Sequence, residues 1–290
     1  MQPIRLEFPP LAPAASHGIL PVRSLVDWTN PLTQGLVDLW PGASLVSAVR
    51  PGQAFTNTNG ATVENKCGPI WRQNNQQIVL YGDSSPENFS RTDRFTVSVV
   101  AGWAALGTWA VVLNRSSGTG NNSGWYVYRD TTNYIRIDMV GTTNSNDHIV
   151  GRFVPFVPFS VGAVYRFVFT YDGSVTGSGF SCWCNGVKLT NIPFGSLTTE
   201  TTCNNYLRVG YRDIDGMANN GWVRDIAIWR RQLTPAEVQS FFANPGQLLA
   251  RPAQPFMDLP PDALLYGSAL YPCFPFGRGD GYATISPGLG

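Results

Sequence analysis

Charged residues are scarce in this chain of 290 residues. They make up 13% of it, and 20 lysines and arginines face 19 aspartates and glutamates. With no excess of either sign, we expect neither nucleic-acid binding nor attraction to an anionic membrane. Apolar runs of about 18 residues are also lacking, so we expect no membrane-spanning helix. The first residues lack the basic and apolar regions of a secretory signal peptide.

Cysteine and histidine are too few for a disulfide scaffold or a structural metal site. The chain holds 5 cysteines and 2 histidines. Cys182 and Cys184 are separated by one residue, so on a strand their sulfurs would point to one face without the geometry of an unstrained disulfide. We therefore predict reduced cysteines that act as small core residues, in a protein that folds in a reducing cytoplasm.

Carboxylates with the spacing of a glycosidase active site are missing as well. Such a site needs an acid and a nucleophile or base about 5–9.5 Å apart. The glutamates stand far apart in the sequence, at positions 7, 64, 87, 200 and 237. A hydrolase triad would need His17 or His148, and no serine lies in a Gly-x-Ser-x-Gly elbow. We predict that the protein has no catalytic residues and is not an enzyme.

Asp213 and Asp215 stand close together, before Gly216, in a predicted loop. Their carboxylates are hard oxygen ligands of the type that Ca²⁺ prefers. Asp-Gly is also the ordinary composition of a turn. Turn chemistry is our main interpretation, with no metal and no other cofactor, and Ca²⁺ at these two aspartates is the alternative.

Patterns that are typical of β-strands occur throughout the middle of the chain. Apolar and polar residues alternate over residues 95–99, 135–139 and 165–171, with the period of two that is typical of strands. We expect further strands over residues 77–81, 109–113, 125–129, 180–184, 206–211 and 222–229. Asn185-Gly186 between two apolar runs predicts a tight hairpin turn.

One helix is predicted, after Thr234. Thr234 is the expected N-cap, Pro235 the first helical residue and Glu237 the partner of a capping box. Asn244-Pro245-Gly246 ends the pattern. Many short strands with one peripheral helix predict an all-β fold, a two-sheet antiparallel jelly-roll sandwich, over residues 31–244.

Proline is concentrated at the two ends of the chain. Of 22 prolines, 5 lie in residues 1–30 and 8 in residues 245–290. Proline-rich segments form neither regular helices nor central strands, so we predict extended arms over 1–30 and 245–290. The arms also carry large apolar residues, which are normally buried against a partner. The candidate docking residues are Ile4, Leu6, Phe8, Phe256, Tyr266, Tyr271, Phe274 and Phe276.

The order of several motifs between residues 90 and 245 resembles that of a known superfamily. The most specific is the stretch from Gly221-Trp-Val-Arg-Asp225 through Leu233-Thr-Pro-Ala-Glu-Val238, and next comes the pair Tyr171-Asp-Gly173 and Asn185-Gly186. In this order the chain resembles the laminin G-like, concanavalin A-like lectin superfamily. The segment Asn30-Pro-Leu-Thr-Gln34, which continues to Trp40, is similar to the lead-in of such proteins encoded by tailed bacteriophages.

This resemblance implies a non-enzymatic virion structural protein that is assembled in the host cytoplasm. We expect a capsid decoration protein whose arms bind the major capsid protein or a tail component, as a homo-oligomer within a symmetric particle. The alternative is a glycan-binding module, on a phage tail or as a secreted lectin, that meets a host-surface glycan. Its candidate residues are Trp125, Tyr126 and Tyr128 with Asn121 and Asn122 of the adjacent loop, although core packing would also explain aromatic residues on strands.

Overall fold

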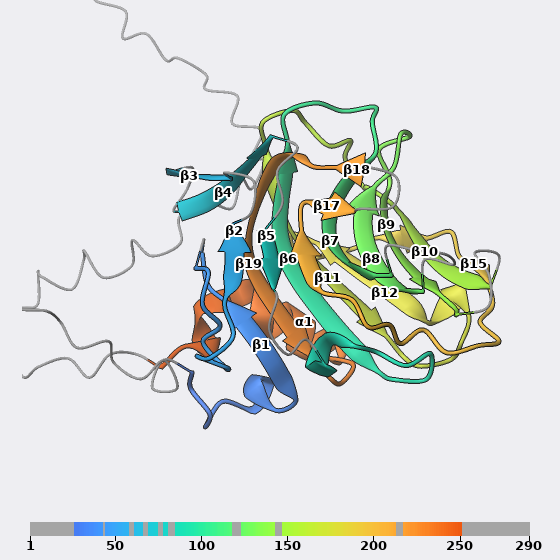
Figure 1. The fold of residues 1–290 in the computed structure, drawn as a ribbon, viewed down its shortest axis with the longest axis horizontal. Helices are drawn as coiled ribbons and strands as arrows, with labels where there is room; N and C mark the ends of the chain where they lie inside the picture. Colours follow the sequence, from blue (N-terminus) through green and yellow to red (C-terminus); the bar gives the residue numbers. More distant parts are fainter. Residues whose placement is uncertain are drawn as a thin grey trace, which may run out of the picture.

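The computed structural model describes residues 26–250, apart from residue 43 and the segments 58–60, 66–68, 75–77, 81–84, 118–122, 143–146 and 213–216. Within these residues two antiparallel sheets pack face to face, with one α-helix outside them (Figure 1). The predicted all-β jelly-roll sandwich is therefore confirmed. None of the described helices is long and apolar enough to cross a membrane.

The first sheet contains the longest strands. In spatial order, its strands are β13 (Val187–Lys188), β12 (Phe180–Cys184), β11 (Val164–Tyr171), β6 (Phe95–Trp103), β19 (Asn220–Trp229), β4 (Pro69–Asn74) and β3 (Thr62–Asn65). A further strand, β1 (Leu36–Trp40), also pairs with β19.

The second sheet lies opposite the first. In spatial order, its strands are β14 (Thr190–Asn191), β10 (His148–Val154), β9 (Ile135–Val140), β8 (Gly124–Arg129), β7 (Ala110–Ser116), β16 (Leu207–Val209), β5 (Ile78–Leu80) and β2 (Phe55–Asn57). β15 (Phe194–Gly195) pairs with β10, and β17 (Tyr211–Arg212) and β18 (Met217–Ala218) form a separate hairpin. Short 3-10 turns cover Pro31–Thr33, Ser85–Glu87, Gly177–Gly179 and Pro245–Leu248.

The main hydrophobic core lies between the two sheets. Strand alternation sends Phe167 and Phe169 of β11 inward from the first sheet, and Trp125 and Val127 of β8 inward from the second. All four are fully or almost fully buried. Cys182 joins this core and Cys184 packs against it, so the two thiols lie on one face of β12 as expected. Cys182, Cys184 and Cys203 are free thiols, and Cys67 and Cys273 lie outside the described residues.

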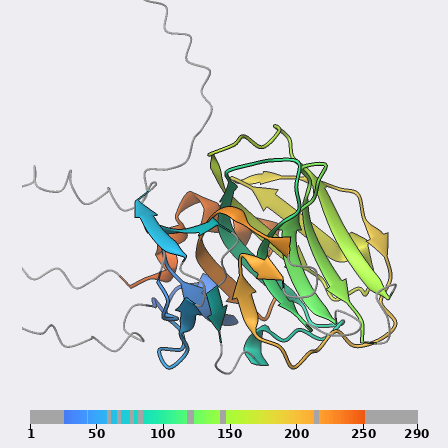
Figure 2. The same ribbon diagram turned by 45° about the horizontal axis from the view of Figure 1, so that its top comes forward.

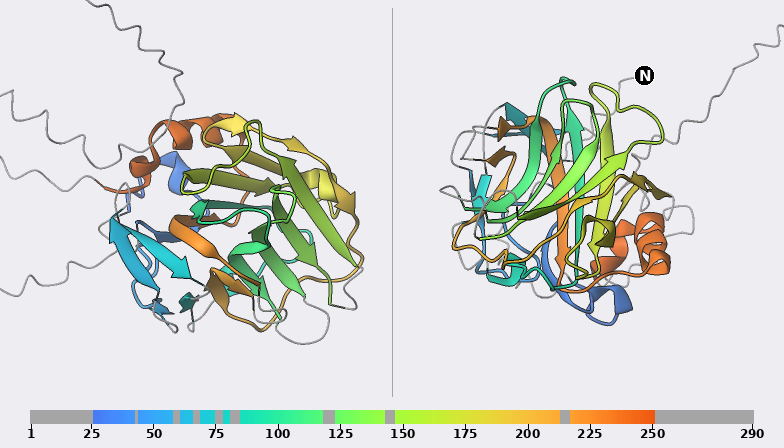
Figure 3. Two further views of the ribbon diagram at one scale, coloured as in Figure 1. Left: turned by 90° about the horizontal axis from the view of Figure 1, so that it is seen from above. Right: turned by 90° about the vertical axis from the view of Figure 1, so that its right-hand side faces the viewer.

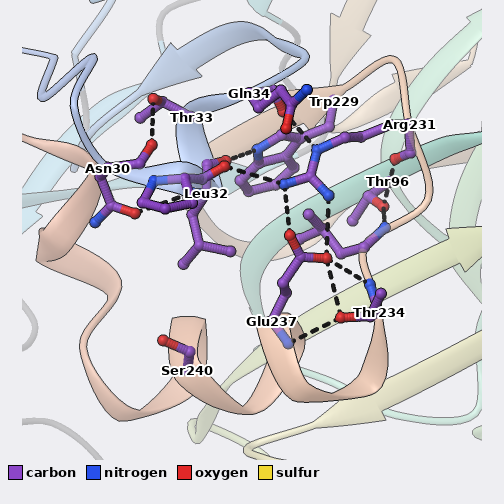
Figure 4. Close-up of polar contacts among 12 residues, drawn as sticks. Asn30, Leu32, Thr33, Gln34, Thr96, Trp229, Arg231, Thr234, Glu237 and Ser240 are labelled. Atoms are coloured by element: carbon purple, nitrogen blue, oxygen red, sulfur yellow. Dashed lines mark hydrogen bonds and ion pairs between the residues drawn. The ribbon is translucent and has the colours of Figure 1, made fainter.

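The predicted helix is confirmed as α1 (Pro235–Ala243), and its capping box is formed. Thr234 Oγ1 accepts a hydrogen bond from the Glu237 backbone N–H at 3.3 Å, and Glu237 Oε2 accepts one from the Thr234 N–H at 2.8 Å (Figure 4). The helix α1 lies on the outer face of the first sheet (Figure 3). Its buried side chains pack with Trp183 and Trp229 of that sheet. A second core therefore lies outside the sandwich, beneath α1.

The hairpin predicted at Asn185-Gly186 joins β12 to β13. Asn185 has φ of 49° and Gly186 has φ of 86°, so both central residues adopt the left-handed conformation that a tight hairpin turn requires.

The two ends of the described chain meet. Val26 and Leu249 form an antiparallel bridge, and the Asp27 N–H donates to Leu248 O at 2.9 Å. Val26 and Leu248 are buried in the second core. Residues 26–30 and 245–250, which the sequence assigned to the arms, thus pack on the sandwich. All eight arm residues proposed for docking lie outside the described residues.

Candidate functional site

The outer face of the second sheet carries side chains that do not belong to the main core. Because residues of β8 alternate between the two faces, Trp125 and Val127 point inward whereas Tyr126 and Tyr128 point outward. The outward tyrosines are nonetheless buried, with 9% and 3% exposure. Something other than the opposite sheet must therefore cover them.

The cover is the β17–β18 hairpin, which lies over β7 (Figure 1). Arg212 of β17 places its guanidinium carbon 4.3 Å from the centre of the Tyr126 ring, within the range of a cation–π interaction. Met217 of β18 packs against the same outward cluster. The hairpin thus closes one side of this face and leaves a hollow beside it.

The strand register brings a carboxylate and a guanidinium next to the tyrosines. β8, β9 and β10 are adjacent strands, drawn green to yellow-green in Figure 2, and Tyr126 stands opposite Asp138 while Tyr128 stands opposite Arg136. The Tyr128 hydroxyl donates to Asp138 Oδ2 at 2.8 Å. The Arg136 guanidinium donates to the same oxygen at 3.3 Å. Oδ2 of Asp138 therefore accepts hydrogen bonds from two side chains, Tyr128 and Arg136.

These side chains line a cavity of about 230 Å³. At its mouth stands Trp109, which is 39% exposed and lies 5.3 Å from the Tyr128 ring, measured between ring centres. The Arg136 guanidinium lies over both rings, at 4.9 Å from Tyr128 and 5.9 Å from Trp109. The complete lining consists of Trp109, Tyr126, Tyr128, Arg136, Asp138, Val140, His148, Arg212 and Met217.

Three buried polar atoms of this lining have no hydrogen-bond partner in the protein. They are Asp138 Oδ1, Arg136 Nε and His148 Nδ1. A buried polar group without a partner costs about 1–3 kcal/mol, so such groups are normally satisfied by ordered water or by a ligand. All three belong to residues that line the same hollow, which makes it the candidate site.

Burial shifts the pKa of two groups in the pocket, Asp138 and Tyr128. It raises the pKa of Asp138, against the opposing effects of the Arg136 charge and of the Tyr128 and Tyr126 hydroxyls. Burial, followed by the nearby charge of Asp138, raises the pKa of Tyr128 as well. The Tyr128 hydroxyl therefore keeps its proton at neutral pH and acts as a donor to Asp138.

The structure separates the residues that the sequence proposed for glycan binding. Tyr126 and Tyr128 lie together in the pocket, but Trp125 faces the opposite way, in the main core. Its indole N–H donates to Glu87 O at 2.7 Å, so Trp125 is unable to contact a ligand on the outer face. Asn121 and Asn122, and the aspartates Asp213 and Asp215, lie outside the described residues.

Several pocket residues were not predicted. Arg136 and Asp138 are the polar residues of the alternating 135–139 strand. Their position opposite two tyrosines follows only from the register between β8 and β9, which the sequence does not give. His148 is the first residue of β10 and stands opposite Val140 of β9. Arg212 reaches the pocket from β17, and residues 213–216 between β17 and β18 lie outside the described residues.

Buried carboxylates occur elsewhere, but away from any opening. Asp38 and Glu87 are both fully buried and share the guanidinium of Arg50. A substrate has no access to this pair. Within the described ranges, no three His, Cys, Asp or Glu side chains come together as metal ligands would.

Known structures share this architecture at low sequence identity. The binding domain of Paraclostridial Mosquitocidal Protein 1 is similar with a TM-score of 0.58 and 15% identity, over 73% of this chain and 52% of that one. A structure of botulinum neurotoxin type C gives a TM-score of 0.54 and 11% identity, with 73% and 52% covered. The binding domain of botulinum neurotoxin serotype G gives 0.55 and 13%, with 72% and 50% covered. The chain thus spans about half the length of these structures.

Sequence comparison identifies the superfamily. No curated protein matches the chain. The profile of the concanavalin A-like lectin/glucanases superfamily, in its laminin G-like form, matches residues 73–239, which is more than half of the chain and includes β6 to β10 and β19. With the two-sheet sandwich described above, this match shows that the chain belongs to the concanavalin A-like lectin/glucanases superfamily.

Proposed function

We propose that the protein is a lectin-like module that binds a saccharide in the pocket on the outer face of the second sheet. The observation that carries the proposal is the set of three buried polar atoms without partners, at Asp138, Arg136 and His148, in one hollow. Sugar hydroxyls would satisfy such atoms, and an aromatic ring beside them would stack on the sugar ring.

Trp109 is the ring that suits this role. It is 39% exposed at the mouth of the cavity, whereas Tyr126 and Tyr128 are covered by neighbouring side chains. Val140 and Met217 add apolar surface to the lining. The pocket therefore offers both the apolar and the polar contacts that a pyranose ring needs.

The similar structures support a binding role. Cell entry of botulinum neurotoxin type C is dependent upon interaction with two ganglioside molecules. Ganglioside headgroups are saccharides, so a structure with this sandwich fold comes from a protein that recognises a glycan. Because gangliosides carry sialic acid, this comparison supports glycan binding in general and not the class of sugar. It supports the alternative of a glycan-binding module better than it supports capsid decoration.

A binding role without hydrolysis also suits the carboxylates. Among the described residues that line the pocket, Asp138 is the single carboxylate, whereas glycoside hydrolysis ordinarily uses two. We expect no release of reducing ends from any glycan that the protein binds. Release of reducing ends by the natural chain that is lost in the Asp138→Asn variant would instead show that the protein is a glycosidase.

Attachment to a virion stays a prediction. It rests on the apolar arm residues, which lie outside the described residues, and the comparisons give it no support. Assembly in the host cytoplasm, homo-oligomerisation and binding to a major capsid protein or tail component remain untested with it.

The test is a glycan array probed with the full chain and with Trp109→Ala. We expect binding to one class of glycan, and a loss of at least tenfold in affinity in the variant because the stacking platform is removed. Trp28→Ala is the matched control, since Trp28 is also exposed, at 51%, and does not line the pocket. An array without binding, or binding that both variants retain, would refute a saccharide site at this pocket.

A further inference from the structure

We infer that the pocket selects an uncharged sugar, and that it takes a single ring at the end of a glycan. This inference rests on the proposed function and names the class of saccharide. It follows from the donors and acceptors that the pocket leaves unpaired, and from its size.

The unpaired atoms require a ligand that both donates and accepts. Tyr128 and Arg136 both donate to Asp138 Oδ2, which is how donors gather at a carboxylate, so its buried Oδ1 is left as an acceptor that needs a donor from the ligand. Arg136 Nε carries a hydrogen and needs an acceptor. A hydroxyl group does both, and neighbouring hydroxyls on one sugar ring could serve both atoms. A carboxylate or sulfate group accepts but does not donate, so it leaves Asp138 Oδ1 unsatisfied.

The Arg136–Asp138 ion pair in the pocket also disfavours an acidic sugar. The Arg136 guanidinium is already paired with the Asp138 carboxylate at 3.3 Å and lies 3.9 Å from Asp130. Arg212, the other arginine of the lining, lies against the Tyr126 ring. A second anion would compete with Asp138 for the Arg136 guanidinium and would be repelled by both aspartates. Binding an acidic group would therefore separate an existing ion pair, whereas a neutral hydroxyl leaves it intact.

The size of the pocket limits the ligand to one ring. Its volume of about 230 Å³ is below the roughly 300–1,000 Å³ of sites that enclose drug-sized molecules. The β17–β18 hairpin closes one side, where Arg212 lies against Tyr126. A chain running through the site would meet this hairpin, so we expect the terminal residue to enter while the next sugar contacts Trp109 at the mouth.

The experiment compares glycans that end in a neutral hexose with the same glycans capped by a sialic acid or a uronic acid. We expect the neutral termini to bind and the acidic caps to abolish binding. Asp138→Asn replaces an acceptor by a donor at nearly constant shape, and we expect it to weaken binding by about 10-fold to 100-fold. Asp93→Asn is the matched control, because Asp93 forms an exposed ion pair with Arg230 away from the pocket.

Each outcome decides a different claim. Preference for acidic termini that Trp109→Ala removes would leave the saccharide site in place and overturn the neutral specificity. Neutral binding that Asp138→Asn leaves unchanged would overturn the donor–acceptor argument. Binding to no glycan would refute the proposed function itself. If Asp138→Asn fails to fold, Tyr128→Phe is the second variant. It keeps the aromatic ring but removes the hydroxyl that donates to Asp138. Unchanged binding of neutral glycans by this variant would also count against the inference.

Discussion

Glu87 lies in an environment that penalises its negative charge. It is fully buried on the turn before β6, and it shares Arg50 with the equally buried Asp38. Burial, together with the hydrogen bond and charge of Asp38, raises the pKa of Glu87 to about 9, although Arg50 opposes this. The native state therefore keeps a proton on Glu87 at a pH where the unfolded chain would have lost it.

This pKa predicts a decrease of stability with pH. Between the ordinary pKa of 4.5 and the native value of about 9, the native state binds more protons than the unfolded state. The contribution of Glu87 to the free energy of unfolding therefore falls as pH rises through this range. Glu87→Gln removes the titration, so we expect its melting temperature to fall less than that of the natural chain between pH 5 and pH 9. Equal slopes would show that Glu87 is ionised in the native state.

Glu200→Gln is the control for this measurement. Glu200 is 51% exposed and forms a surface ion pair with Arg91 at 3.4 Å. This variant tests whether the loss of any glutamate, buried or exposed, changes the dependence of the melting temperature on pH. We expect the profile of Glu200→Gln to follow that of the natural chain.

Thr234 and Glu237 cap α1 by exchanging hydrogen bonds, so each deletion leaves a helix-end donor without its partner. We expect Thr234→Ala and Glu237→Ala each to lower the free energy of unfolding by about 0.5–2 kcal/mol. Glu237 also pairs with Arg231 at 2.8 Å, so Glu237→Ala should have the larger effect. Urea unfolding at neutral pH measures both. Midpoints within error of the natural chain would mean that the cap contributes nothing to the fold.

At the level of elements, the β12–β13 turn isolates the effect of backbone conformation. Gly186 has φ of 86°, and a Cβ added there would meet no atom closer than 3.8 Å. Gly186→Ala therefore costs conformational strain without a steric clash. We expect a loss of about 1–2 kcal/mol in the free energy of unfolding.

Gly52→Ala is the matched substitution. Nothing lies within 4 Å of a Cβ at Gly52, and its φ is not in the left-handed region. Alanine there reduces the entropy of the unfolded chain, so we expect no loss or a gain of about 0.4–1 kcal/mol. Equal effects of the two substitutions would contradict the strain at Gly186.

Elements with local signals were predictable from the sequence. The Asn185-Gly186 turn and the Thr234 cap depend on residues that are neighbours in the chain, and both are formed as expected. Pairings between distant segments carry no such signal. β16 pairs with β5 and with β7, and the sequence between these strands does not specify either register.

The site was only half predictable for a related reason. Gly124-Trp-Tyr-Val-Tyr128 shows two alternating sets, Trp125 with Val127 and Tyr126 with Tyr128, and both are apolar or aromatic. Alternation divides these residues into two faces but does not tell which face is the core. The pairing of β8 with β9 decides it, because it places Tyr126 opposite Asp138 and Tyr128 opposite Arg136 on the outward side.

At the scale of the whole molecule, the two outer faces of the sandwich differ. The outer face of the first sheet is covered by α1 and by the segments at both ends of the described chain, including Val26 and Leu248. The outer face of the second sheet carries the β17–β18 hairpin and the polar pocket. The pocket therefore faces away from the place where the chain enters and leaves the sandwich.

The bridge between Val26 and Leu249 has a consequence for how the chain could be reconnected. Bridge partners have Cα atoms about 4.5–5.5 Å apart, so a linker of a few residues would join the two ends without strain. New ends could then be opened between Phe156 and Val157, which are 84% and 66% exposed in the loop between β10 and β11. We expect this circular permutant of residues 26–249 to fold with a cooperative thermal transition and to keep its binding properties. A permutant that fails to fold would show that the order of the strands along the chain, and not their contacts alone, is needed to assemble the sandwich.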